Sequence, residues 1–252
     1  MSGASLPCNS PDGTRLNLYR WGQGPDVLIV HGQGEHGQRY DHVGQYLAGS
    51  GFRVTLVELR GHGQSGGLRG HVANWSRYSE DVAAAVHELE SPYAMVAHSM
   101  GGLVTLDYLR QNLEPEPIGV VLSNPLVGLA FEPDKVKTTA AQILTRVFPE
   151  LALTTDLDTN KLSRDPAVVR AYNDDPEVIR RVSVRWYTEM VAAIGRVRDG
   201  SQFKLPLLML VGSSDGITSP QASEALVQSW GGPKVMHVYE GFYHELFNEP
   251  EK

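Results

Sequence analysis

A serine, an aspartate and a histidine each follow a short apolar segment with the composition of a buried strand. They are Ser99 after residues 93–97, Asp215 after 206–211, and His244 after 234–239. This is the chain order of nucleophile, acid and base in one large group of Ser–Asp–His sites. Because parallel strands end at the same edge of a sheet, the three side chains are expected to meet there. The spacing predicts a catalytic triad for acyl transfer.

Three serines compete for the role of nucleophile. The Gly-x-Ser-x-Gly pattern of a nucleophile elbow surrounds Ser65 and Ser214, but neither serine lies directly between a strand and a helix. Ser99 departs from the pattern because Ala97 replaces the first glycine. It nevertheless stands between a predicted strand and a predicted helix, where an elbow must lie. We therefore predict Ser99 as the nucleophile; the alternative is a serine that only caps the helix.

The segment 31–37, His-Gly-Gln-Gly-Glu-His-Gly, follows the first apolar strand and permits two interpretations. Its Gly-x-Gly-x-x-Gly string, with Glu58 at the end of the next strand, matches a dinucleotide-binding turn. Glu35, however, would repel a pyrophosphate. In a hydrolase the same glycines let the N–H groups of Gln33 and Met100 form an oxyanion hole. The predicted triad favours this second interpretation.

The elements that must position these residues alternate between short strands and longer helices. Near-continuous apolar runs, typical of a parallel sheet covered on both faces, predict strands at 26–30, 53–57, 93–97, 118–122, 206–211 and 234–239. Helical patterns intervene at 40–48, 78–89, 100–112 and 220–230. The alternation predicts an α/β fold with a mostly parallel, doubly wound sheet.

The alternation stops across residues 125–204. This segment holds two amphipathic helical patterns, at 133–148 and 176–197, and no convincing strand. We interpret it as a helical cap inserted over the carboxyl edge of the sheet, where open α/β sheets bind ligands. Ordinary packing helices are the alternative. The core is then expected to comprise residues 1–124 and 205–252.

Composition argues against several classes of function. The 252 residues, 41% of them hydrophobic, can bury one large core. The net charge of −7 comes with no basic stripe, so neither nucleic acid nor an anionic membrane is an expected partner. The single cysteine, Cys8, cannot form an internal disulfide, which favours the cytoplasm. Residues 1–7 lack a signal-peptide pattern, and no apolar run reaches the ~20 residues that span a bilayer.

With these residues in place, the chain resembles the monoacylglycerol lipase family of α/β-hydrolases over almost its whole length. The resemblance rests on HGQGEHGQRY at 31–40, RGHGQSGG at 60–67, HSMGG at 98–102, LSNPL at 122–126, VGSSD at 211–215 and YEGFYH at 239–244. It implies the α/β-hydrolase fold with an inserted helical cap. It also implies hydrolysis of monoacylglycerol to glycerol and free fatty acid through an acyl-enzyme on Ser99, with neither a metal nor an organic cofactor.

The resemblance further implies a polar pocket for the glycerol head group near Glu35 and Arg39. The alternative is that these two residues only form an ion pair at the surface. Lysophospholipids, small esters and peptides with a free amino terminus remain as other substrates. A binding protein that keeps the fold without catalysis is another function left open. The cap helices are expected to cover the sheet, with transient contact with lipid aggregates as the alternative.

The chain departs from the family pattern at three places. Ala97 replaces the usual glycine of the elbow, and Phe247 stands where some relatives carry a histidine near the alcohol exit. The family usually has a closing helix after the histidine, whereas Lys252 follows His244 closely. Without such a helix, apolar surface of the sheet would be exposed.

Overall fold

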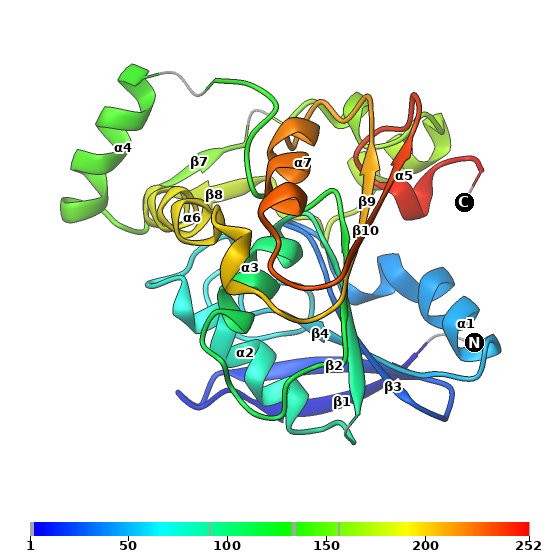
Figure 1. Cartoon of the computed structure of the whole chain (residues 1–252). Helices are drawn as coiled ribbons and strands as arrows, with labels where there is room; N and C mark the ends of the chain where they lie inside the picture. The colour runs from blue at the N-terminus through cyan, green and yellow to red at the C-terminus, as the bar shows by residue number, and fades with distance from the viewer. Residues whose placement is uncertain (1–2, 91, 133–134, 156, 252) are drawn as a thin grey trace.

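A single eight-stranded sheet runs through the computed structural model, which describes residues 3–90, 92–132, 135–155 and 157–251. The strand order is β1-β2-β4-β3-β5-β6-β9-β10 (Figure 1). The strands are β1 (Ala4–Asn9), β2 (Arg15–Trp21), β3 (Asp26–Val30), β4 (Arg53–Glu58), β5 (Tyr93–His98), β6 (Val120–Ser123), β9 (Leu207–Gly212) and β10 (Lys234–Tyr239). Among the described strands of this sheet, β2 pairs antiparallel with β1 and β4, and the other pairs are parallel. The carboxyl ends of β3, β4, β5, β6, β9 and β10 therefore share one edge of the sheet.

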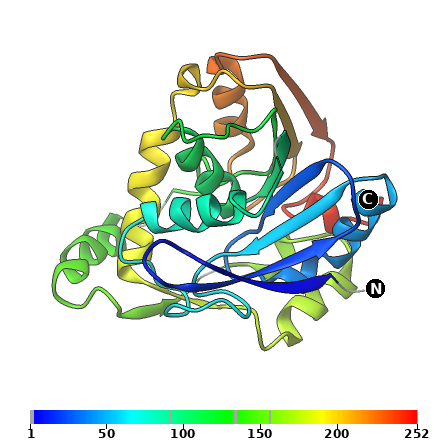
Figure 2. The same ribbon diagram turned by 90° about the horizontal axis from the view of Figure 1, so that it is seen from below.

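Helices cover the two faces of the sheet unequally. The helices outside the insertion are α1 (Asp41–Gly49), α2 (Ser76–Val86), α3 (Met100–Leu109) and α7 (Pro220–Ser229). The larger apolar core lies between the sheet and α2, α3, α7 and a further helix, α6 (Val184–Val197), and includes the fully buried Leu28, Met95 and Met209. Figure 2 shows α2, α3 and α6 together on this side. A smaller core around Trp21 and Leu56 packs beneath α1 on the other face.

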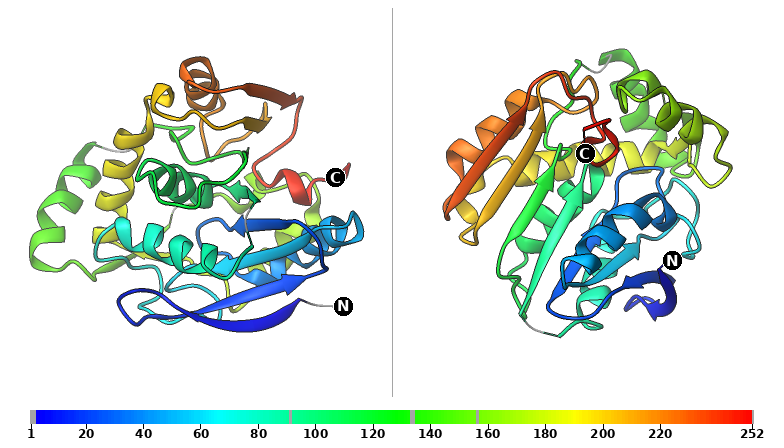
Figure 3. Two further views of the ribbon diagram at one scale, coloured as in Figure 1. Left: turned by 60° about the horizontal axis from the view of Figure 1, so that its bottom comes forward. Right: turned by 90° about the vertical axis from the view of Figure 1, so that its right-hand side faces the viewer.

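Between β6 and β9 the chain leaves the sheet and forms an insertion. Its elements are α4 (Lys135–Val147), β7 (Ala152–Thr154), α5 (Pro166–Asp174), β8 (Arg181–Ser183) and α6 (Val184–Val197). Seen from the side, the insertion lies at the end toward which the parallel strands point (Figure 3). It is bonded to the loops there, since the N–H of Ile179 donates to the carbonyl of Gly34 at 3.0 Å. Short 3₁₀ helices are η1 (Gly37–Tyr40), η2 (Thr159–Lys161), η3 (Gly200–Gln202) and η4 (Leu246–Asn248).

The predicted fold class is confirmed, with corrections inside the insertion. Residues 176–183 are not helical, because the N–H groups of Ile179 and Ser183 bond to core loops at Gly34 and Gly70. Two short strands, β7 and β8, pair antiparallel where no strand was expected. The helix α5 was missed, and Pro133, the predicted start of the first cap helix, lies outside the described residues.

Strand β10 also differs from its prediction. It was expected to be covered on both faces, but Val235, Val238 and Tyr239 are 53%, 49% and 38% exposed. Within the described residues no strand pairs with its outer edge.

No described helix combines the length and apolarity needed to cross a membrane.

Candidate active site

Ser99 lies on a sharp turn between β5 and α3, at the carboxyl edge of the sheet. Its φ of 52° and ψ of −120° are strained for a residue with a Cβ. Neighbouring backbone holds the turn, since the Ser99 N–H donates to Ser123 O at 3.1 Å and the Ser99 carbonyl accepts the N–H of Leu126 at 2.9 Å. Gly101 permits the close packing, because a Cβ there would lie 2.2 Å from the carbonyl oxygen of Val30. The strand–turn–helix geometry of a nucleophile elbow is therefore present at Ser99.

The fold brings Ser99, His244 and Asp215 together as a buried hydrogen-bonded chain. Nε2 of His244 lies 2.9 Å from Oγ of Ser99, and Nδ1 lies 2.8 Å from Oδ2 of Asp215. The Asp215 carboxylate also accepts the N–H groups of Ile217 at 2.8 Å and Thr218 at 3.1 Å, and the Thr218 hydroxyl at 2.7 Å. A fixed carboxylate at Nδ1 favours the tautomer that carries its proton there. The lone pair of Nε2 then faces the serine hydroxyl.

Electrostatics prepares this histidine to accept a proton. Burial opposes the imidazolium, but the charge of Asp215 and its hydrogen bond outweigh burial, so the pKa of His244 is raised above its ordinary value. Burial likewise opposes the Asp215 carboxylate. The charge of His244 and the hydrogen bonds from His244 and Thr218 nevertheless lower the pKa of Asp215. The pair thus stabilises the protonated ring of His244 and the ionised form of Asp215 together.

The turn after β3 places Gln33 beside this chain of residues. Oε2 of Glu35 accepts the N–H of Gly32 at 2.8 Å and so fixes the start of the turn. Among the hydrogen bonds of the described residues, none uses the backbone N–H of Gln33 or of Met100. The side-chain amide of Gln33 is also buried, without a partner in the described part of the chain. The N–H groups of Gln33 and Met100 are therefore two backbone donors without a protein partner in the described part of the chain.

Two other motif residues have structural partners instead. The Ser65 hydroxyl donates to Glu58 O at 2.6 Å and accepts the N–H of Asn17 at 2.9 Å, so Ser65 braces a loop. The Glu58 carboxylate is buried and accepts three hydrogen bonds, two of them from the N–H groups of Gly37 at 2.7 Å and Gln64 at 2.8 Å. A carboxylate occupied in this way cannot hold a ribose. The dinucleotide interpretation of this turn is wrong.

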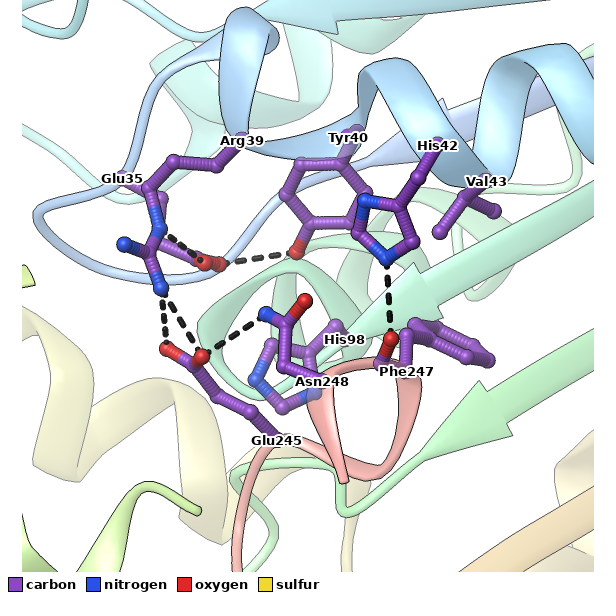
Figure 4. Close-up of a pocket in the computed structure, with 9 residues that line it drawn as sticks. All are labelled: Glu35, Arg39, Tyr40, His42, Val43, His98, Glu245, Phe247 and Asn248. Atoms are coloured by element: carbon purple, nitrogen blue, oxygen red, sulfur yellow. Dashed lines mark hydrogen bonds and ion pairs between the residues drawn. The ribbon is translucent and has the colours of Figure 1, made fainter. Parts of the chain in front are cut away.

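Glu35 and Arg39 form a buried charge network with Glu245, the residue after His244. Nη2 of Arg39 lies 2.7 and 2.8 Å from the two carboxylate oxygens of Glu245, and Nε lies 3.2 Å from Oε1 of Glu35 (Figure 4). Tyr40 donates to Glu35 at 2.8 Å, and Asn248 donates to Glu245 at 2.8 Å. The side chains of Arg39, Glu35 and Glu245 are only 9%, 5% and 3% exposed. They are therefore not a surface ion pair.

A cavity of about 10 Å³, room for about one water molecule, lies beside this network. Its walls include Glu35, Arg39, His98 and Glu245 (Figure 4). The ring of His98 also lies 4.7 Å from that of His244. Burial would raise the pKa of Glu35, but His98, Arg39 and neighbouring groups lower it. Burial raises the pKa of Glu245 despite the opposing charge of Arg39. The guanidinium of Arg39 thus lies between two buried carboxylates and bonds to both.

Sequence reasoning missed two residues of this site, Glu245 and Asn124. The side-chain amide of Asn124 donates to the carbonyls of Tyr243 and His244 at 3.0 and 2.7 Å. These partners lie 119 and 120 positions away along the chain, so no local pattern could signal the contact. Glu245 could have been noticed as an acid directly after the predicted base, but its partner Arg39 lies 206 positions away along the chain.

The fold and the site together define a serine hydrolase of the α/β-hydrolase class. A sequence model of the family described as "Serine aminopeptidase, S33" matches residues 25–251, and the chain belongs to this family. It is 33% identical to a monoacylglycerol lipase of Mycolicibacterium smegmatis, over 90% of this chain and 83% of that one. It is 30% identical to phospholipase YtpA of Bacillus subtilis, over 90% of each. The crystal structure of Paleococcus ferrophilus monoacylglycerol lipase superposes with a TM-score of 0.87 at 32% identity, covering 94% and 93% of the two chains.

Proposed function

We propose that this hydrolase cleaves carboxylic esters of lipids through an acyl-enzyme on Ser99. His244 takes the hydroxyl proton as Ser99 attacks the ester carbonyl, and Asp215 stabilises the imidazolium. The N–H groups of Gln33 and Met100 donate to the oxyanion. His244 then gives its proton to the leaving alcohol, and later takes a proton from the water that hydrolyses the acyl-enzyme. The observation that supports this mechanism most is the unbroken Ser99–His244–Asp215 chain, at 2.9 and 2.8 Å.

Monoacylglycerol is the proposed substrate, with Glu35 and Arg39 at the polar end that receives the glycerol head group. Arg39 is the only lysine or arginine among the residues that line the small cavity, and two carboxylates already bond to it. A phosphate would find no uncommitted lysine or arginine there, whereas a neutral glycerol requires none. Because the cavity holds only about one water molecule, the proposal requires it to widen when the head group binds. Lysophospholipid is the second candidate, because the chain is similar to the Bacillus phospholipase.

We also propose that the insertion meets lipid aggregates during turnover. Its outer surface exposes a set of large apolar side chains on α4, on β7 and between them: Ile143, Val147, Phe148, Leu151 and Leu153. An exposed apolar patch of this kind is typical of a surface that contacts lipid or another protein. The net charge of −7 favours neutral over anionic lipid surfaces.

The proposed working compartment is the cytoplasm, since the single cysteine, Cys8, is buried and unpaired.

Turnover of monoolein, lysophosphatidylcholine, a soluble p-nitrophenyl ester and a short peptide by the purified protein tests these proposals. Monoolein is expected to be cleaved fastest, and faster turnover of the phospholipid would contradict the substrate proposal.

The Ser99→Ala variant should lose on the order of 10⁴- to 10⁶-fold in kcat. The exposed Ser214 provides a matched control, and Ser214→Ala should keep wild-type turnover. A fluorophosphonate should label Ser99; an active Ser99→Ala variant would contradict the mechanism.

A further inference from the structure

We infer that Asn124 is a positioning residue, whose side chain holds the loop that carries His244 against the loop that carries Asp215. The inference rests on the proposed function, because it assigns Asn124 a part in the reaction that starts at Ser99. Asn124 directly follows β6, which lies between β5 and β9 in the sheet. It therefore stands between the strand that leads to the nucleophile and the strand that leads to the acid.

The side-chain amide of Asn124 bonds to both loops at once. Nδ2 donates to the carbonyl oxygens of Tyr243 at 3.0 Å and His244 at 2.7 Å. Oδ1 accepts the N–H of Gly212, the last residue of β9, at 2.9 Å. Both hydrogens of the amide nitrogen and the amide oxygen are therefore used. The amide links the histidine loop directly to the end of the acid's strand.

The backbone of Asn124 is tied to the same region. Its N–H donates to Leu210 O of β9 at 2.9 Å. The Thr218 hydroxyl lies 3.2 Å from the carbonyl oxygen of Asn124 and 2.7 Å from Oδ2 of Asp215. Asn124 is thus fixed to the acid's strand and to a partner of the acid, which makes it a firm anchor for the histidine loop.

The backbone conformation at position 124 narrows the choice of residue to asparagine. The φ of Asn124 is 42°, in the left-handed region, and the side chain is only 1% exposed. Glycine, asparagine and aspartate adopt this region most readily. Glycine has no side chain, and an ionised aspartate has no donor for the two carbonyls. Of the three, only asparagine can make all three side-chain contacts.

Apart from Asn124, the histidine loop is held at two places. Ser214 of the acid's loop donates its N–H to the carbonyl of Phe242 at 3.1 Å, and the N–H groups at 244 and 245 bond to the insertion. The N–H of His244 donates to Lys161 O at 3.2 Å, and the N–H of Glu245 donates to Leu162 O at 2.7 Å. Without the amide of Asn124, the position of the imidazole would depend more on these other bonds. A displacement of about 1 Å in a catalytic group can cost about 10²-fold in rate.

The Asn124→Gly variant tests the inference, because it removes the amide without straining the backbone. Asn112→Gly is the matched control: Asn112 also has a left-handed φ, of 50°, but it is exposed at the end of α3. With a soluble p-nitrophenyl ester, Asn124→Gly should lower kcat by about 10²-fold with little change in KM. Asn112→Gly should match wild type. Circular dichroism of each variant verifies that the measured protein is folded.

Proton NMR supplies a readout that does not depend on turnover. The far-downfield resonance of the His244 Nδ1 proton, bonded to Asp215, should be present in wild type and in Asn112→Gly. It should be shifted or lost in Asn124→Gly. If Asn124→Gly does not fold, Asn124→Asp takes its place, since it keeps the shape and the acceptor for Gly212 but lacks the donors.

A folded position-124 variant with wild-type kcat and an unchanged resonance would overturn the inference. An equal loss of kcat in Asn112→Gly would overturn it as well. Failure of the proposed function looks different: wild type itself would turn over no ester, and the NMR comparison would still report whether Asn124 positions His244.

Discussion

The carboxyl edge of the core and the insertion that lies over it are built in contrasting ways. At the core edge, buried amides, carboxylates and a guanidinium bond to one another and to backbone, as around Asn124 and Arg39. In the insertion, α4 packs on α6 through contacts such as Thr145–Thr188, and leaves Ile143 and Val147 63% and 65% exposed. The two regions therefore differ in the kind of interaction that they use. Directional bonds fix the proposed chemistry, and non-directional apolar surface faces the proposed substrate.

After the loss of the nucleophile in Ser99→Ala, the largest effect expected on the core side comes from Asp215→Asn. Removing the charge at Nδ1 while keeping the shape favours the wrong tautomer of His244, so kcat should fall by about 10⁴-fold. The soluble p-nitrophenyl ester is the substrate to use, because it reports the chemistry without lipid binding. A loss of less than about tenfold would contradict the role proposed for Asp215.

Breaking the buried charge network should cost stability. Arg39→Met leaves Glu35 and Glu245 buried without their cation, and such a loss typically costs about 3–5 kcal/mol of unfolding free energy. Urea unfolding measures it. Arg77, whose pair with Glu80 lies at the surface, is the control, and Arg77→Met should cost less than about 1 kcal/mol. Equal losses in the two variants would contradict the distinction between the buried and the exposed pair.

On the insertion side, the double variant Ile143→Thr/Val147→Thr should weaken binding to neutral phosphatidylcholine vesicles by about tenfold. The estimate assumes that the two side chains together lose about 1.4 kcal/mol of apolar transfer free energy. Turnover of the soluble ester should not change. Val235→Thr/Val238→Thr is the matched control, because it alters exposed apolar residues on β10 instead. If both double variants weaken vesicle binding equally, α4 is not the lipid-facing surface.

The smallest effect expected is a displacement of the pH profile. The proposed base is neutral His244, so protonation abolishes activity, and a raised pKa moves that loss to higher pH. The acid limb of kcat/KM should therefore have its midpoint above the ordinary histidine value of about 6.5. In Asp215→Asn the midpoint should move down, because the carboxylate that raises the pKa is gone. A wild-type midpoint below about 6.5 would contradict this assignment.

The sequence predicted the parallel sheet well because most of its strands are near-continuous apolar runs, as at 26–30 and 207–212. Strand β2 was missed because polar Asn17 interrupts its pattern. That residue is buried through bonds to Ser5, Glu58 and Ser65, which no local pattern reveals. Helix α5 had a readable start, since Asp165 caps it and Pro166 opens it, but it is short.

The sequence predicted those site residues whose type and position after a strand indicate a chemical role by themselves. Ser99, Asp215 and His244 were singled out by order and by the strand ends, and the structure brings all three together. The positions of Asn124 and Glu245 depend on partners that become neighbours only after folding. An asparagine before a proline, as in Asn124-Pro125, is typical of an ordinary turn. Local sequence therefore indicates the proposed reacting groups. It does not indicate the residues that hold them in place, such as Asn124 and Glu245.

The open outer edge of β10 has a consequence for the protein at high concentration. An unpaired strand offers its N–H and C=O groups to another chain, and Val235 and Val238 add apolar surface beside them. Two molecules that meet at these edges would extend one sheet into the next. Self-association should then grow with concentration. The substitution Val238→Lys should prevent this pairing, because a charged side chain on an edge strand opposes association with a second strand.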